Sequence, residues 1–313
     1  KVAPQVWAAL GDVHLYVEPF AGSLAVLLKR PDWHTHSLAT VNDMDRYIAN
    51  FWRAVEYAPD EVARYADWPV NEADLEARHL WLVNEGVQRL ADGLWNDPEW
   101  CDPKIAGWWV WGICNWIGSG WCDGNGPHTY THTAGRGVNR QRPHIANAGR
   151  GVNRSSVYAG REDRREMLVA YMRELQERLR NVRVCCGDWQ RVVTTGALSP
   201  GRNVGIFLDP PYSIAAKRKM SLYNHDSGDV AHAVREWAIA NGDNPRYRIV
   251  LAGYLDEHVA RMPDTWRMEQ WTAAASYQTS SGNGKNQENR RKETLWYSPH
   301  CLRIQDELLN DSA

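Results

Sequence analysis

A run of five apolar residues that ends in Asp209-Pro210-Pro211-Tyr212 places the strongest constraint on how this chain folds. The run, residues 204–208, has the length and composition of a strand that is buried on both faces. Such strands belong to open α/β sheets, which bind ligands in loops at the carboxyl ends of their strands. The two prolines hold the backbone extended and present the Asp209 carboxylate beside a prolyl carbonyl. The sequence therefore predicts a ligand site at residues 209–212.

The chemistry of this tetrapeptide suits an amino group. Asp209 and the Pro210 carbonyl supply two neighbouring acceptors, and the amino nitrogen of a nucleobase is a poor nucleophile because its lone pair is delocalised into the ring. Accepting both amino hydrogens directs that lone pair toward an electrophile, while the Tyr212 ring can stack on the base. Judged alone, the tetrapeptide is also compatible with an ordinary turn after a core strand, because matches to short motifs often arise by chance.

A second motif lies near the start of the chain. Residues 14–28 have the pattern of a short strand, a Gly-containing turn and an apolar helix, which lays a nucleotide-like ligand over a helix N-terminus. The pattern G-x-G-x-x-G is absent, which favours a cofactor without a pyrophosphate. Asp43 follows the next expected strand, residues 37–41, at the spacing where such folds grip a ribose diol. A helix N-cap is the alternative role for Asn42 or Asp43.

Three segments together resemble the S-adenosylmethionine-dependent DNA adenine-N6 methyltransferases of the Dam-like (D12) family: Glu18-Pro19-Phe20-Ala21-Gly22-Ser23, Asn42-Asp43-Met44-Asp45 and Asp209-Pro210-Pro211-Tyr212. The cofactor motif comes first and the catalytic motif last, which looks like the alpha arrangement of amino-methyltransferases. Residues 50–52, 184–189 and 291–297 are also similar to family segments. Leu24 stands where many members have a glycine, and the family's Gly-Gly-Lys loop would fall at or before Lys1.

This resemblance implies a Rossmann-like methyltransferase sheet with helices on both faces. The catalytic domain would comprise residues 1–57 and 162–313, and an inserted helical and loop domain for target recognition would comprise residues 58–161. Catalysis would fall to Asp209, Pro210, Pro211 and Tyr212. The resemblance further implies that S-adenosylmethionine is bound by Lys1, Glu18, Pro19, Phe20, Ala21, Gly22, Ser23, Asp43, Met44, Asp188, Trp189 and Asp209.

The charge distribution points to double-stranded DNA as the partner. Net charge is only −2, yet residues 124–161 contain no Asp or Glu while arginines accumulate. Arginine suits both phosphates and guanine edges. The segment 134–140 recurs as 148–154, so two similar loops or arms are expected. A solvated basic insert without a nucleic-acid role is the alternative. The candidate DNA-binding residues are Arg136, Arg140, Arg142, Arg150, Arg154, Lys217 and Lys219.

Other patterns narrow the class of protein. No stretch approaches 18 consecutive apolar residues and no leader pattern opens the chain, so we expect no membrane association and a cytoplasmic location, in a bacterium or encoded by a phage in a bacterial host. Tryptophans at 108–121 favour core packing over base stacking. The irregular spacing of Cys114, Cys122, His128 and His132 favours reduced thiols over a zinc site, and we expect no metal.

Four other functions stay open at this point. An RNA adenine methyltransferase or a DNA N4-cytosine methyltransferase would use the same catalytic geometry. A non-catalytic nucleic-acid-binding relative is another, because the family's Gly-Gly-Lys loop, which helps to hold the methionine part of the cofactor, would fall at or before Lys1. A protein-glutamine methyltransferase is less favoured, because that resemblance would place Asn at position 209.

Overall fold

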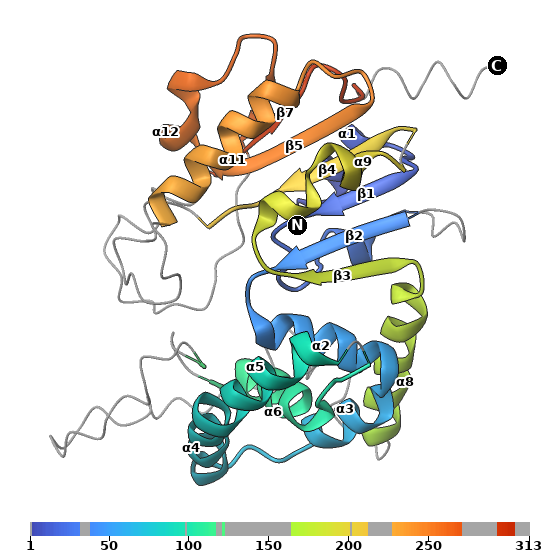
Figure 1. The fold of residues 1–313 in the computed structure, drawn as a ribbon, viewed down its shortest axis with the longest axis vertical. Helices are drawn as coiled ribbons and strands as arrows, with labels where there is room; N and C mark the ends of the chain where they lie inside the picture. The colour runs from blue at the N-terminus through green and yellow to red at the C-terminus, as the bar shows by residue number, and fades with distance from the viewer. Residues whose placement is uncertain are drawn as a thin grey trace, which may run out of the picture. The chain divides into compact units, whose positions relative to one another are not determined.

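The computed structural model describes residues 2–31, 38–97, 99–116, 121–122, 164–200, 202–211, 227–270 and 293–303 (Figure 1). The chain divides into two compact units, one made of Lys1–Met44 with Asn181–Ala313 and the other of Asp45–Arg180. The first unit is therefore built from two segments that are distant in sequence. The predicted domain limits, at 57 and 162, differ from these unit limits because helices at 46–57 and 164–179 group with the second unit.

The first unit contains a seven-stranded sheet in the order β3-β2-β1-β4-β5-β7-β6, within the described residues. Strands β1 to β5 run parallel, and β7 pairs antiparallel with both β5 and β6. The strand order reverses between β1 and β4, which is where open α/β sheets form a ligand-binding crevice. The strands are β1 Leu15–Glu18, β2 Leu38–Asp43, β3 Val182–Cys186, β4 Val204–Leu208, β5 Tyr247–Tyr254, β6 Arg267–Gln270 and β7 Glu293–Tyr297.

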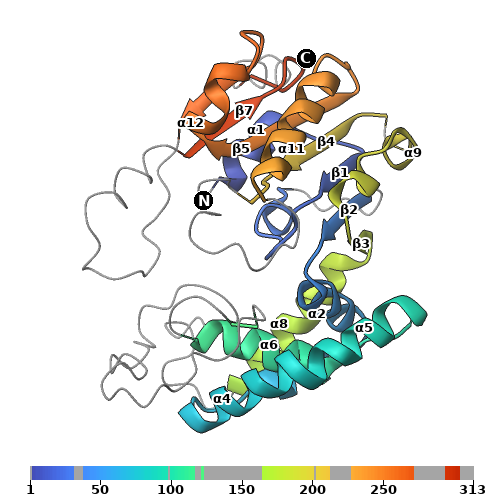
Figure 2. The same cartoon turned by 60° about the vertical axis from the view of Figure 1, so that its left-hand side comes forward.

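Helices α1 (Ala3–Leu10) and α11 (Ser227–Asn241) cover opposite faces of this sheet (Figures 1 and 2). Val234 and Ala238 of α11 share a core cluster with alternate residues of β1, β4 and β5. The residues between these alternate ones face α1. A Cβ atom added to Gly205 of β4, for example, would lie 3.0 Å from Val13 and 3.2 Å from Leu10. Glycine therefore permits α1 to pack closely on the middle of the sheet.

Shorter elements of the first unit connect the strands. They are η1 (Leu27–Lys29), η4 (Trp189–Val192), α9 (Thr195–Leu198), α12 (Leu255–His258) and η5 (Val259–Arg261). All five residues of β4 are buried, as the apolar run predicts for a central strand. The alternately exposed β6 lies at the sheet edge.

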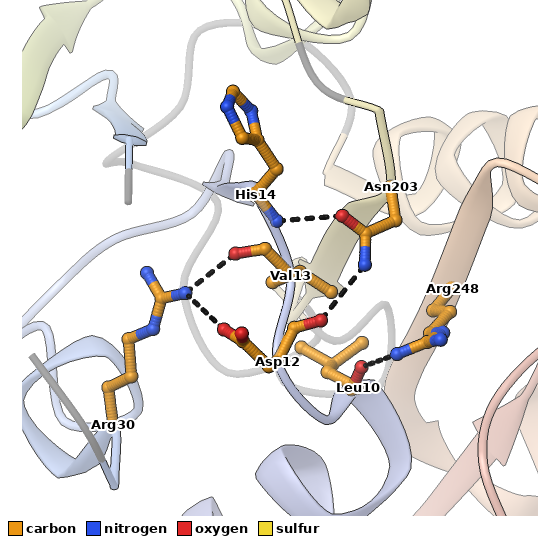
Figure 3. A network of polar contacts seen from close by, with 7 residues as sticks. All are labelled: Leu10, Asp12, Val13, His14, Arg30, Asn203 and Arg248. Carbon is orange, nitrogen blue, oxygen red and sulfur yellow. Dashed lines mark hydrogen bonds and ion pairs between the residues drawn. The ribbon is translucent and has the colours of Figure 1, made fainter. Parts of the chain in front are cut away.

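The loop that leads from α1 into β1 is fastened by side chains from distant parts of the chain (Figure 3). The Asn203 side chain accepts from the backbone N–H of His14 and donates to the carbonyl of Asp12, both at 2.9 Å. The buried Arg30 guanidinium donates to the Val13 carbonyl at 2.7 Å, and Arg248 donates to the Leu10 carbonyl. These bonds hold the start of β1 in place. The other end of this four-residue strand is Glu18.

The second unit is helical in its described part. It contains α2 (Arg46–Tyr57), α3 (Pro59–Ala66), α4 (Glu72–Trp81), the π-helical turn η2 (Leu82–Gly86), α5 (Val87–Asn96), α6 (Pro103–Asn115) and α8 (Arg164–Leu179). Asn50 of α2 is buried and bonds the backbone of Asp102 in both directions, at 3.0 and 2.9 Å. Trp111 of α6 is 1% exposed, which confirms core packing for that tryptophan. Trp108, Trp109, Trp116 and Trp121 are partly buried.

Candidate functional site at the carboxyl edge of the sheet

The predicted catalytic motif begins where β4 ends. Asp209 is exposed, Pro210 is buried and Pro211 is half-buried, so the carboxylate emerges at the edge of the sheet while the first proline packs beneath it. Strand β4 pairs with β1, which places Asp209 beside the end of β1 at the reversal of strand order. Tyr212 lies outside the described residues.

Four carboxylates share one side of this edge. In paired strands, residues in register point to the same face, and side chains alternate along each strand. Tyr16 is in register with Ala39 of β2 and Gly205 of β4, so Glu18, Asp43 and Asp209 follow on the face that α1 covers. Glu293 of β7 is in register with Tyr254 of β5 and joins the same face. The sequence pattern alone did not identify Glu293, because the pairing of β7 with β5 is needed to place it.

Glu18 is the most deeply placed of these acids, with 3% of its surface exposed. Burial, helped by the charges of Asp209 and Asp43, raises the pKa of its carboxyl to about 8. The Tyr16 hydroxyl, which donates to Glu18 Oε2 at 3.0 Å, and the backbone of Leu27 act in the opposite direction. Burial, followed by Asp209, also raises the pKa of Glu293. The edge therefore holds acidic groups that favour a positively charged neighbour.

Asp43 connects this edge to the turn after β1. Its Oδ2 accepts a hydrogen bond of 2.9 Å from the backbone N–H of Gly22, and its carbonyl accepts one of 3.0 Å from Gly187. Gly22 has a φ of 47°, and a Cβ added there would meet nothing within 4 Å. Asp43 thus holds the turn in place beside open space, a structural role in addition to the predicted ribose contact.

Asn42 contributes an unsatisfied acceptor at the end of β2. Its side chain is 2% exposed, and its Nδ2 donates to the carbonyls of Pro19 at 3.0 Å and Gly187 at 2.9 Å. These two bonds use both hydrogens of the amide nitrogen. The amide oxygen, Oδ1, is buried and has no hydrogen-bond partner among the described residues. A buried acceptor of this kind costs free energy unless a donor reaches it.

The helix expected after the first turn is absent, and this prediction was wrong. The only helical element that forms in this part of the described chain is the three-residue 3-10 turn η1, Leu27–Lys29. The backbone turns twice before it, with positive φ at Gly22 and at Leu24, where φ is 53°. A residue in that region interrupts right-handed helical geometry. A ligand at this edge therefore meets a tight turn and carboxylates, with no long helix N-terminus from this segment.

The other predicted cofactor residues occupy different environments. Pro19 and Ala21 are buried, Ser23 is exposed, and Met44 is 51% exposed. Trp189 is 6% exposed and packs with Phe20, their ring centroids 6.1 Å apart, so it supports the loop from within the core. Asp188 is exposed and accepts from the backbone N–H of Gln190 at 2.8 Å as the N-cap of η4. Lys1 lies outside the described residues.

The predicted DNA-binding residues lie outside the described part of the chain: Arg136, Arg140, Arg142, Arg150, Arg154, Lys217 and Lys219. All six cysteines are free thiols. Among the described residues, no group of three or more His, Cys, Asp or Glu side chains is arranged to hold a metal ion. None of the helices in the same residues has the length and apolar character required to cross a membrane.

Comparison with known proteins gave no match: no family model fits this chain, and no curated protein matches it.

Proposed function

We propose that this protein is an S-adenosylmethionine-dependent methyltransferase that modifies the N6 amino group of adenine in double-stranded DNA. The observation that carries the proposal is the convergence of Glu18, Asp43 and Asp209 on one face of the sheet at the reversal of strand order. This is the place where α/β sheets bind ligands. The predicted cofactor and catalytic motifs are distant in sequence, but they begin where the neighbouring strands β1 and β4 end.

The residues at this edge fit the cofactor chemically. S-adenosylmethionine supplies a methyl group on a positively charged sulfonium, and it also carries an ammonium, hydroxyls and an adenine amino group. Buried and partly buried carboxylates favour such charge. The unsatisfied Asn42 Oδ1 suits one of the donors of the adenosine part. The open space at Gly22 leaves room for a ligand beside the Asp43 carboxylate.

In the proposed reaction, Asp209 and the Pro210 carbonyl accept the two hydrogens of the adenine amino group. Holding them turns the nitrogen lone pair toward the methyl carbon, so that the N–C bond forms as the C–S bond breaks. The nitrogen becomes cationic and its proton acidic only after this transfer, so Asp209 acts chiefly by orientation. The proton is then lost to solvent, and S-adenosylhomocysteine leaves as a neutral thioether. Tyr212 would stack on the adenine.

The proposed substrate is duplex DNA with the target adenine swung out of the stack, because its amino group is inaccessible to this chemistry within the duplex. The acid-free segment 124–161 supports a nucleic-acid partner through its arginines. In the sequence, this segment follows α6 of the second unit.

The test is direct product analysis. The protein is incubated with S-adenosylmethionine labelled in its methyl group and with duplex DNA or RNA, and the nucleic acid is digested to nucleosides. We expect labelled N6-methyladenine from DNA, absent with Asp209→Ala. Labelled N4-methylcytosine or RNA-derived N6-methyladenine would replace the proposed substrate with one of the alternatives. Cofactor binding in calorimetry without any methylated nucleoside would favour the non-catalytic relative.

A further inference from the structure

Glu18 occupies an environment that disfavours a negative charge. Its carboxyl is buried, and the strongest influences on it within the described chain are Tyr16 on its own strand, Asp209 after β4, Asp43 of β2 and the backbone of Leu27. None of these carries a positive charge, and two are carboxylates. A buried carboxyl beside two others retains its proton at pH values where an exposed one has lost it. Its pKa of about 8 agrees with this geometry.

We propose that Glu18 holds a proton in the free protein and releases it when a cation binds at the carboxyl edge, so that the site selects S-adenosylmethionine over its demethylated product by charge. This inference rests on the proposed function and adds a specificity-determining role for one residue. The two ligands differ by the methyl group and the sulfonium charge, and both carry the same ammonium. The charge of the sulfonium is therefore what the ionised Glu18 would distinguish.

The proposal also connects proton binding to turnover. When the methyl group leaves, the sulfonium becomes a neutral thioether and the attraction for the Glu18 carboxylate is lost. Glu18 then regains a proton from solvent, because Asp43 and Asp209 remain beside it. The protonated carboxyl no longer stabilises a positive ligand, which weakens product binding and favours exchange for fresh cofactor.

The first measurement is isothermal titration calorimetry with each ligand, in buffers of different ionisation enthalpy. We expect S-adenosylmethionine to release close to one proton at pH 7 and S-adenosylhomocysteine to release clearly fewer. The ratio of their affinities should rise by up to about tenfold per pH unit below about pH 8 and level off above it, as expected for one linked proton. The ammonium of each free ligand is titrated separately, and its contribution is subtracted from the ratio, because the sulfonium lowers the pKa of the ammonium in S-adenosylmethionine.

Two variants make this measurement specific. Glu18→Gln should abolish the difference in proton release and flatten the pH dependence of the affinity ratio. Asp264→Asn removes an exposed carboxylate of the same unit and should leave both unchanged. Equal proton release by the two ligands in the wild-type protein would overturn the inference even if methyl transfer is observed, and methyl transfer itself tests the proposed function separately.

The protonation of Glu18 can also be read in the free protein. Infrared difference spectroscopy should show a protonated carboxyl at pH 7 that disappears as the pH is raised through about 8. If Glu18→Gln fails to fold, Tyr16→Phe serves instead: it removes a donor to the carboxylate, so the transition should move to higher pH. A Glu18 carboxyl already ionised at pH 6 would refute the inference whether or not the cofactor binds.

Discussion

The hydroxyl of Tyr16 donates a 3.0 Å hydrogen bond to Oε2 of Glu18, and both side chains are buried. The two residues are separated by Val17 on β1 and therefore point to the same face, where the ring of Trp7 from α1 lies 4.8 Å from that of Tyr16. Burial, followed by the neighbouring Glu18, raises the pKa of the Tyr16 hydroxyl well above its ordinary value. Tyr16 consequently keeps its hydroxyl proton at any physiological pH and can donate it to the Glu18 carboxyl.

Replacing Asp209 with Ala should separate catalysis from cofactor binding. In the proposed mechanism Asp209 orients the adenine amino group, so turnover should fall by about two to three orders of magnitude or more. The affinity for S-adenosylmethionine should change only a few-fold. Single-turnover kinetics and calorimetry measure the two effects. A variant that methylates DNA at near-normal rates would contradict the assigned role.

Asp43 has both a structural and a proposed binding role, and two variants distinguish them. Asp43→Ala removes the acceptor for the Gly22 N–H as well as the charge, so it should weaken cofactor binding by about 1 to 3 kcal/mol and also lower the free energy of unfolding. Asp43→Asn keeps an acceptor and should restore stability more than binding. Calorimetry and urea denaturation report each quantity. Full cofactor affinity in both variants would place the ribose contact elsewhere.

Leu24 should reverse the usual ranking of alanine and glycine. Its φ of 53° costs a non-glycine residue about 1 to 2 kcal/mol, yet its side chain is completely buried. Removing that side chain costs about 2 to 5 kcal/mol, so both Leu24→Ala and Leu24→Gly should destabilise the protein. Because only glycine relieves the strain, Leu24→Gly should be the more stable of the two by about 1 kcal/mol in denaturation experiments. The opposite order would argue against the left-handed conformation.

The buried His258 should make the protein sensitive to acid. Burial lowers its pKa to about 4, although the adjacent Glu257 opposes this change. The unfolded chain, with the ordinary pKa near 6.5, binds more protons between these values, so stability should fall as pH decreases from about 6.5 to about 4. The loss has an upper limit of about 3 kcal/mol. Urea denaturation at several pH values in this range gives the free energy of unfolding as a function of pH. That free energy should depend less steeply on pH in His258→Gln than in the wild type, and an equal pH dependence would exclude His258 as the cause.

The arginines of segment 124–161 should determine how duplex binding responds to salt. Neutralising one phosphate-contacting arginine should reduce the slope of log affinity against log salt by about one. An arginine that reads a base should instead relax the preference at one position, at a cost of about 1 to 3 kcal/mol. Single alanine variants at Arg136, Arg140, Arg150 and Arg154, tested on a randomised duplex pool, distinguish these cases. If all four behave like the wild type, target recognition resides elsewhere.

The predictable part of the fold follows from apolar runs. The expected strands at 37–41 and 204–208 correspond to β2 and β4, because central strands must be hydrophobic on both faces. The mixed α/β class is therefore confirmed. Strand β6 was not anticipated, since its half-exposed Arg267–Gln270 lacks such a run.

The site was predictable at its motifs and less so in its interactions. Glu18, Asp43 and Asp209 were identified from sequence, but their common face depends on strand register, which the sequence does not state. The expected helix after Gly22 failed because Leu24 is buried at a positive φ, which its apolar side chain does not reveal. The one signal in the sequence is that Leu24 stands where many members of the resembled family have a glycine. The unsatisfied Asn42 Oδ1 likewise emerges only from the bonds that occupy its amide nitrogen.

The bond between His14 and Asn203 joins residues 189 positions apart, which has a consequence for how the protein folds during synthesis. Strands β1 and β2, which pair with each other, emerge from the ribosome long before β4, the partner of β1 at the sheet centre. Until then their apolar edge has no native neighbour, while the helices of the second unit already have their own. The helical unit should therefore fold first and bring the two halves of the sheet within reach, since local contacts form faster than distant ones. Slow joining of the sheet would then limit the folding rate of the whole chain.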